Sequence, residues 1–183
     1  MLGEKEENIL IYLIKKYNVR IMAEIGIWKS YTLKSILKSD CNKVLQEYWA
    51  VDQWKVLGPE HLHMGRVTQE EWDGLYYNSC SCMPFFKQLR VLKLNSEKAS
   101  LLFNNRFFPG GYFDLVFLDA SHFYEDVLRD IKLWVPLIKK GGIISGHDYK
   151  INTKKNHRVK TAVDEYFGNT NVTVINNCWY KIL

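Results

Sequence analysis

The chain has 183 residues, of which 47% are hydrophobic and 25% are charged, and its formal charge is +5. This composition is ordinary for a soluble globular protein and excludes disordered, collagen-like and coiled-coil chains. The length suits a single domain spanning residues 1–183. No apolar run approaches the roughly 20 residues that a membrane helix needs, so we expect no membrane span.

The N-terminus and the cysteines predict a cytoplasmic protein. The first ten residues are acidic and polar, where a signal peptide would be basic and then apolar. Of the four cysteines, only Cys80 and Cys82 are close in sequence, and their Cys-x-Cys spacing differs from that of a zinc knuckle. Sparse cysteines favour a reducing compartment.

Hydrophobic periodicity predicts alternating helices and strands up to residue 52. Apolar residues at helical spacing predict helices over residues 4–17 and 30–39. Two short apolar runs predict buried strands over residues 19–26, ending at Gly26, and 48–52, ending at Asp52.

The regular pattern is lost between residues 53 and 88. Gly58-Pro59 and Asp73-Gly74 are turn signals, and one polar helix is predicted over about residues 67–78. A connection of this length is unusual inside a compact domain. It therefore favours a lid or a substrate-binding insertion.

Regular elements return at residue 89. Strands are predicted over residues 89–94, 113–119, 143–147, 172–175 and 178–182, and helices over residues 96–103, 127–138 and 158–167. We expect the second of these helices to kink or restart near Pro136 and to stop at Gly141-Gly142. Asn176-Asn177 favours a hairpin between the last two strands.

This alternation predicts an α/β fold with a Rossmann-like, doubly wound and mostly parallel sheet of seven strands. The closing hairpin would add an antiparallel strand. In open sheets of this kind, ligands bind outside the carboxyl ends of the strands. Four groups of polar residues stand at those ends: Glu24 to Gly26, Asp52, Asp119 to His122, and His147-Asp148.

The first two groups favour a ligand that contains adenosine. Gly26 lets the backbone approach a ligand, and the helix that follows offers free N–H groups. A carboxylate at the end of the second strand, such as Asp52, commonly binds the two ribose hydroxyls. A glycine or aspartate at a strand end equally often serves only to form a turn. The phosphate loop of NTPases and the Gly-x-Gly-x-x-Gly of dinucleotide enzymes are both missing, so an NAD-dependent dehydrogenase is a poor alternative.

Longer motifs resemble a known family. Ala23 to Trp28 and Val51 to Trp54 are similar to the first two motifs of class I S-adenosylmethionine-dependent methyltransferases. The stretch from Phe113 to Val127 resembles the small-molecule O-methyltransferase branch with its macrocin- and cephalosporin-type members, as do residues 130–134, 141–149 and 159–163. The resemblance covers residues 20–168 apart from 55–88, and it implies S-adenosylmethionine as the cofactor.

The resemblance implies a cofactor site at the strand ends. Its residues would be Glu24, Gly26, Trp28, Ser30, Asp52, Gln53, Asn95, Ser96 and Asp119. The first two would frame the methionine moiety, Asp52 would bind the ribose beside Gln53 or Trp54, and Asn95-Ser96 would reach the adenine edge. Ser30 stands where relatives often carry glycine and would narrow the space there.

The resemblance also implies a metal site. Asp119 and Asp148 match two divalent-metal ligands of catechol-type enzymes, but Tyr149 replaces the third. Two carboxylates still suit Mg²⁺, which commonly keeps several waters. A metal-free site stays open.

The catalytic residues expected from this comparison are His122, Asp119, Asp148 and His147. His122 stands where the catechol-type enzymes place a lysine base, and a neutral imidazole with a pKa near 6.5 suits removal of a hydroxyl proton. Alternatively, His122 only caps the following helix, as Ser121 also could. His147 would meet His122 at the next strand end, or would fix that strand end by a hydrogen bond.

The favoured function is O-methylation of a small hydroxylated molecule. One alternative is an RNA methyltransferase, in which basic residues of the 150–160 segment, among them Lys154, Lys155, His157 and Arg158, contact phosphates. Another is a catalytically degenerate module that only binds the cofactor, because Ser30 and Tyr149 depart from the family pattern. The sequence leaves a homo-oligomer open and does not identify the methyl acceptor.

Overall fold

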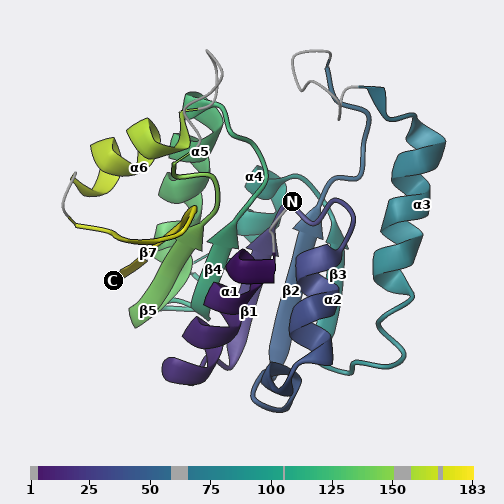
Figure 1. The fold of residues 1–183 in the computed structure, drawn as a ribbon, viewed down its shortest axis with the longest axis horizontal. Helices are drawn as coiled ribbons and strands as arrows, with labels where there is room; N and C mark the ends of the chain where they lie inside the picture. The colour runs from purple at the N-terminus through teal and green to yellow at the C-terminus, as the bar shows by residue number, and fades with distance from the viewer. Residues whose placement is uncertain (1–3, 59–65, 105, 151–157, 169–170) are drawn as a thin grey trace.

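The computed structural model describes residues 4–58, 66–104, 106–150, 158–168 and 171–183, and they form a seven-stranded sheet covered on both faces (Figure 1). The strand order is β3-β2-β1-β4-β5-β7-β6. The strands are β1 Ile21–Ile25, β2 Glu47–Asp52, β3 Leu89–Lys93, β4 Phe113–Leu118, β5 Ile138–Gly146, β6 Thr173–Ile175 and β7 Cys178–Ile182. The first five pair in parallel, and β7 is antiparallel to both β5 and β6. The predicted fold class is confirmed.

Six α-helices accompany this sheet in the described part of the chain. They are α1 Glu4–Lys16, α2 Tyr31–Lys38, α3 Gln69–Cys80, α4 Ser96–Ser100, α5 Tyr124–Trp134 and α6 Val159–Phe167. Within the described residues, no helix is both long and apolar enough to cross a membrane.

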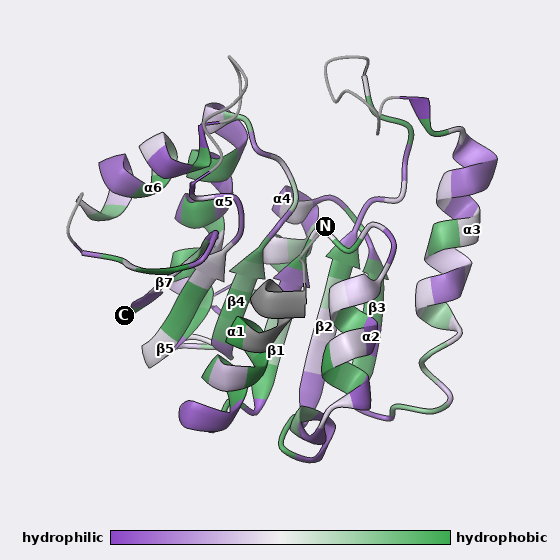
Figure 2. Ribbon diagram, viewed as in Figure 1, coloured by the Kyte–Doolittle hydropathy of each residue, from purple (hydrophilic) through white to green (hydrophobic). Residues whose placement is uncertain are grey.

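Two hydrophobic cores lie on opposite faces of the sheet, because successive side chains of a strand point to opposite sides. In β1, Met22 belongs to the core under α1, α2 and α3, whereas Ala23 belongs to the core under α4, α5 and α6. The central strands are accordingly apolar along most of their length (Figure 2). Every residue of β4 except Asp114 is buried.

The predicted helix over residues 127–138 is wrong at its end. Helix α5 stops at Trp134, and residues 135–137 form a 3₁₀ turn that contains Pro136, which lacks the N–H that a continuing helix needs. Ile138 already pairs with Phe113 in the sheet, and the β4–β5 register shifts before it resumes at Leu115 and Ile143. Gly141-Gly142 thus lies within β5, in an irregular segment, and does not end a helix.

Two further expectations need correction. Asp73 and Gly74 are not in a turn but inside α3, which begins with a capping box between Thr68 and Glu71. The helix expected over residues 96–103 divides into α4 and a 3₁₀ turn, Leu101–Phe103. The predicted helix in the 53–88 segment is nevertheless present, two residues later than expected.

Candidate active site

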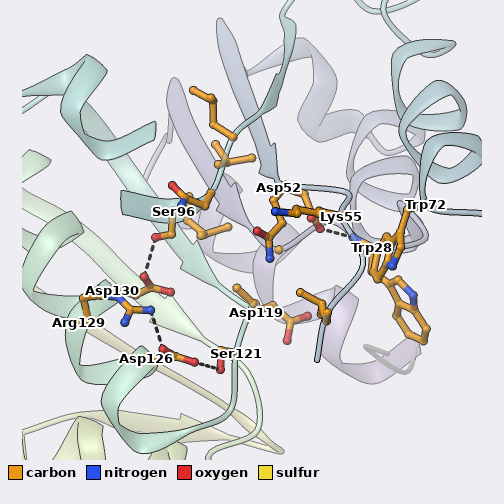
Figure 3. A pocket seen from close by; sticks show the side chains of 18 residues that line it. Trp28, Asp52, Lys55, Trp72, Ser96, Asp119, Ser121, Asp126, Arg129 and Asp130 are labelled. Atoms are coloured by element: carbon orange, nitrogen blue, oxygen red, sulfur yellow. Dashed lines mark hydrogen bonds and ion pairs between the residues drawn. The ribbon is translucent and has the colours of Figure 1, made fainter. Parts of the chain in front are cut away.

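A cavity of about 240 Å³ lies at the carboxyl ends of β1, β2 and β4 (Figure 3). Seven of the nine residues expected to bind the cofactor line it: Gly26, Trp28, Asp52, Gln53, Asn95, Ser96 and Asp119. The parallel strands bring these residues together because their carboxyl ends meet at one edge of the sheet.

Gly26 is needed where β1 and β4 end side by side. Its φ is +94°, and a Cβ atom on it would lie 2.4 Å from the carbonyl oxygen of Asp119. Both features exclude a side chain at this position. The glycine therefore keeps the backbone of two strand ends in close contact at the wall of the cavity.

Asp52 organises the loop that follows β1. Its Oδ2 accepts the N–H groups of Ile27 and Trp28, both at 2.9 Å, and its Oδ1 accepts the N–H of Trp54, also at 2.9 Å. The carboxylate thus stabilises these turns by hydrogen bonds and also lines the cavity. The two interpretations of Asp52 that the sequence leaves open are compatible.

Glu24 and Ser30 are not among the residues that line the cavity. Glu24 is 1% exposed and accepts a hydrogen bond from the Tyr48 hydroxyl, whose pKa is raised by burial and by this carboxylate. The Ser30 hydroxyl oxygen lies 2.6 Å from that of Ser79 in α3. Its φ of +62° explains why glycine suits this position, but its side chain turns away and does not narrow the cavity.

Further lining residues were not anticipated from the sequence. Trp72 comes from α3, while Asp126, Arg129 and Asp130 come from the first turns of α5 (Figure 3). The three α5 residues carry a signal in their i, i+3, i+4 spacing, which places them on one helix face beside a strand end. For Trp72, only tertiary packing brings it to the cavity.

Asp130 is a buried carboxylate in the cavity wall, 5% exposed. The Ser96 hydroxyl donates to it at 2.6 Å and in turn accepts the indole N–H of Trp134 at 2.8 Å. Burial raises the pKa of Asp130 to about 6, against the lowering effects of Ser96 and the Arg129 charge.

The four residues expected to be catalytic form one cluster beside the cavity. Nε2 of His122 lies 2.9 Å from Oδ2 of Asp148 and 3.9 Å from Oδ1 of Asp119. Nδ1 of His147 lies 3.1 Å from Oδ1 of Asp148 and 3.5 Å from Oδ1 of Asp119. Within the described residues, candidate metal-ligand atoms of Asp119, His122 and Asp148 all lie within 4.8 Å of one another.

The charge of this cluster corrects the expectation of a neutral imidazole. Burial lowers the pKa of His122, but the hydrogen bonds and charges of Asp119 and Asp148 outweigh it and raise the pKa to about 9. In the same way, burial raises the pKa of each carboxyl, whereas the two histidines hold both pKa values below their usual range. At neutral pH the structure therefore favours an imidazolium between two carboxylates.

Neighbouring residues clarify two open points. Ser121 accepts the N–H of Phe123 at 3.3 Å, one residue before α5 begins, and donates its hydroxyl to Asp126 within the helix at 2.6 Å, while the His122 ring faces the carboxylates. Tyr149, which stands at the third ligand position, is 7% exposed and donates its hydroxyl to Asp164 in α6 at 2.5 Å. Its side chain thus joins α6 to the end of β5.

Comparison with known proteins agrees with this architecture. The family model described as a methyltransferase domain matches residues 23–149, which is more than half of the chain. A search of curated proteins finds no match.

Several solved O-methyltransferase structures share the fold. One from Bacillus cereus, in complex with S-adenosylhomocysteine, has a TM-score of 0.61 at 14% identity. The match covers 100% of this chain and 83% of the Bacillus cereus chain. The O-methyltransferase NovP has a TM-score of 0.64 at 19% identity, with coverages of 98% and 80%. TomG from Streptomyces achromogenes, in complex with S-adenosylmethionine, has a TM-score of 0.64 at 12% identity, with coverages of 99% and 82%.

Proposed function

The chain belongs to the methyltransferase-domain family, and on that premise we propose that it methylates a hydroxyl group of a small molecule with S-adenosylmethionine. The observation that carries this proposal is the double position of Asp119. This residue lines the cavity and also belongs to the His122–Asp148 cluster, so a cofactor site and a proton-accepting site adjoin. The bound cofactors in the Bacillus cereus and TomG structures support the choice of cofactor.

The cavity residues fit this cofactor. Asp52, at the end of β2, would hold the ribose hydroxyls, and Asn95-Ser96 would reach the adenine edge. The close approach of backbone at Gly26 leaves the cavity wall free of side-chain bulk there. Trp72 is 2% exposed, and its indole N–H has no hydrogen-bond partner in the described part of the chain. When bound, S-adenosylmethionine supplies an electrophilic methyl group on a sulfonium.

His122 is the residue that accepts the hydroxyl proton in this proposal. The carboxylates of Asp119 and Asp148 stabilise the imidazolium that proton transfer produces. Proton acceptance starts from the minor neutral form of the ring, because the cluster favours the cation. Holding the hydroxyl oxygen in line with the methyl group contributes the larger part of the acceleration.

Mg²⁺ is the alternative source of positive charge at the cluster. Asp119 and Asp148 would hold it, with water in the remaining positions. Tyr149 is committed to Asp164 and offers no third ligand. Because Nε2 of His122 already lies 2.9 Å from Oδ2 of Asp148 and Tyr149 offers no third ligand, we favour methyl transfer without a metal.

Transfer of a labelled methyl group to a panel of phenols, catechols and sugars tests the function. His122→Gln is expected to lower turnover by about 100-fold or more while cofactor binding, measured by calorimetry, stays unchanged. Lys43→Gln is the control, because Lys43 is exposed and pairs with the exposed Asp40. Full single-turnover activity in His122→Gln would contradict the role of this residue.

The same assay in EDTA tests the metal. We expect activity to persist after chelation, and a return of lost activity on addition of Mg²⁺ would instead assign Asp119 and Asp148 as ligands. Cofactor binding without transfer to any acceptor would favour a binding module over an enzyme.

A further inference from the structure

The C-terminal hairpin brings a residue to the catalytic cluster from far along the chain. Strands β5 and β7 are antiparallel, and Gly146 pairs with Trp179. The residues just before β7 therefore lie beside those just after β5, which are His147 and Asp148 (the β7 and β5 ends are seen in Figure 1). Asn177 is the residue in this position.

Four contacts of Asn177 all reach the segment from His147 to Lys150. Its carbonyl oxygen accepts the N–H of Tyr149 at 3.0 Å, and its Oδ1 accepts the N–H of Lys150 at 2.9 Å. Its Nδ2 donates to Oδ1 of Asp148 at 2.9 Å and lies 3.4 Å from Nε2 of His147. One side chain thus contacts both the backbone and the reactive groups of this turn.

The turn has an uncommon backbone conformation. Asp148 has a φ of +57°, in the left-handed region that few residues other than glycine, asparagine and aspartate adopt. Asp148 is 6% exposed, and its two carboxylate oxygens have different partners. Oδ2 faces His122, while Oδ1 faces Asn177 and His147. The Asn177 amide therefore fixes the oxygen opposite to the one that His122 uses.

We propose that Asn177 is a positioning residue of the active site, which orients the Asp148 carboxylate toward His122. A hydrogen bond from a neutral amide to a carboxylate is charge-assisted and directional, so it limits rotation of the carboxylate plane. The kinetic part of this inference rests on the proposed function, whereas the geometric part does not.

Asn177→Asp is the sharpest variant. Aspartate has nearly the same shape, retains an oxygen for the Lys150 N–H and leaves the backbone bond to Tyr149 intact. It removes only the donor and places a second carboxylate against Asp148. Asn177→Ala removes the side-chain contacts without adding charge. Asn176→Asp is the matched control, because Asn176 is exposed and lies in the same hairpin turn.

Two measurements on the full chain test the proposal. Imidazole NMR signals of His122 and His147, assigned with His122→Gln and His147→Gln, should shift in both Asn177 variants and stay unchanged in Asn176→Asp. With a labelled methyl donor and an acceptor from the phenol panel, kcat should fall about tenfold or more, further for Asn177→Asp than for Asn177→Ala. The KM for S-adenosylmethionine should remain unchanged.

The two arms separate the failure of this inference from the failure of the proposed function. Wild-type imidazole signals in Asn177→Asp would overturn the positioning role, whatever the activity. A loss of stability with unchanged kcat per folded molecule would also overturn it. Shifted imidazole signals in a chain that methylates no acceptor would support the positioning geometry and count against the proposed function alone.

Discussion

Asp130 illustrates how one buried side chain couples the cavity wall to the stability of the fold. Burial raises its pKa to about 6, whereas an aspartate in an unfolded chain titrates near about 3.9. The folded protein therefore binds a proton on Asp130 more tightly than the unfolded chain does. The stabilisation is fully present below about pH 4 and is lost as the pH rises through 6.

Asp130→Asn should consequently be more stable than the wild type at pH 7.5, by about 1 to 3 kcal/mol, because a difference of about two pKa units corresponds to this range. The amide oxygen can still accept the Ser96 hydroxyl. At pH 4 the difference should nearly vanish. Urea denaturation at both pH values measures it.

Asp40→Asn serves as the control for that experiment. Asp40 is exposed and pairs with Lys43, which lowers the pKa of this carboxyl, so no gain is expected at pH 7.5. An equal change in the stability of Asp130→Asn at both pH values would show that the charge of Asp130 is not the cause.

The sequence predicted which residues lie together at the candidate site better than how their side chains interact. The carboxyl ends of predicted strands were enough to bring Asp119, His122 and Asp148 together, because parallel strands share one edge. The pKa of His122 was not predictable, since it depends on distances to two carboxylates from different strands. The direction of the Ser30 side chain was missed for a similar reason, because its partner is in α3.

At the scale of elements, the sequence located nearly every helix and strand but misjudged several boundaries, above all the end of α5 and the start of β5. Val135 and Ile138 continue the helical spacing of α5, yet one lies in a 3₁₀ turn and the other starts β5. Periodicity cannot distinguish these outcomes, because the choice is made by pairing of Ile138 with Phe113 across the sheet. A local hydrophobic pattern contains no information about which distant segments pair in the sheet.

Helix α3 is attached to α2 through a buried pair of hydroxyl groups. Ser30 and Ser79 are 1% and 0% exposed, and their oxygens are 2.6 Å apart. Ser79 donates its own proton to the carbonyl oxygen of Leu75, so Ser30 is the donor in the pair. This link holds the segment that carries Trp72 to the cavity.

Ser79→Ala should therefore cost more than Ser30→Ala. The first variant leaves the buried Ser30 hydroxyl without its acceptor, at a cost of about 1 to 3 kcal/mol, whereas the second leaves Ser79 bonded to Leu75. The double variant should be no less stable than Ser79→Ala alone, because no buried donor is then left over. A double-mutant cycle by urea denaturation measures the coupling, and simple additivity would contradict the buried link.

At the scale of the whole molecule, the two halves of the chain supply different parts of the site. Residues up to Ser96 provide the loops around Gly26, Asp52 and Asn95, while the segment from Asp119 to Asn177 provides the cluster of histidines and aspartates. The C-terminal hairpin thus contacts the candidate active site as well as forming the end of the sheet. A chain without it would lack the contacts that Asn177 makes to the end of β5.

The net charge of +5 raises the question whether RNA is the methyl acceptor, and RNA binding can be measured directly. That alternative depends on Lys154, Lys155, His157 and Arg158. The first three lie outside the described residues, Arg158 is exposed, and the neighbouring Lys160 is paired with Asp164. The formal charge of +5 is modest and Lys160 is paired, so we expect weak retention of a single-stranded RNA at low salt and none near 150 mM. Filter binding across a salt series measures this, with Lys154→Gln/Lys155→Gln as the matched variant. Retention at 150 mM that this variant abolishes would contradict the expectation, because each phosphate contact adds about 0.7 to the slope of log affinity against log salt.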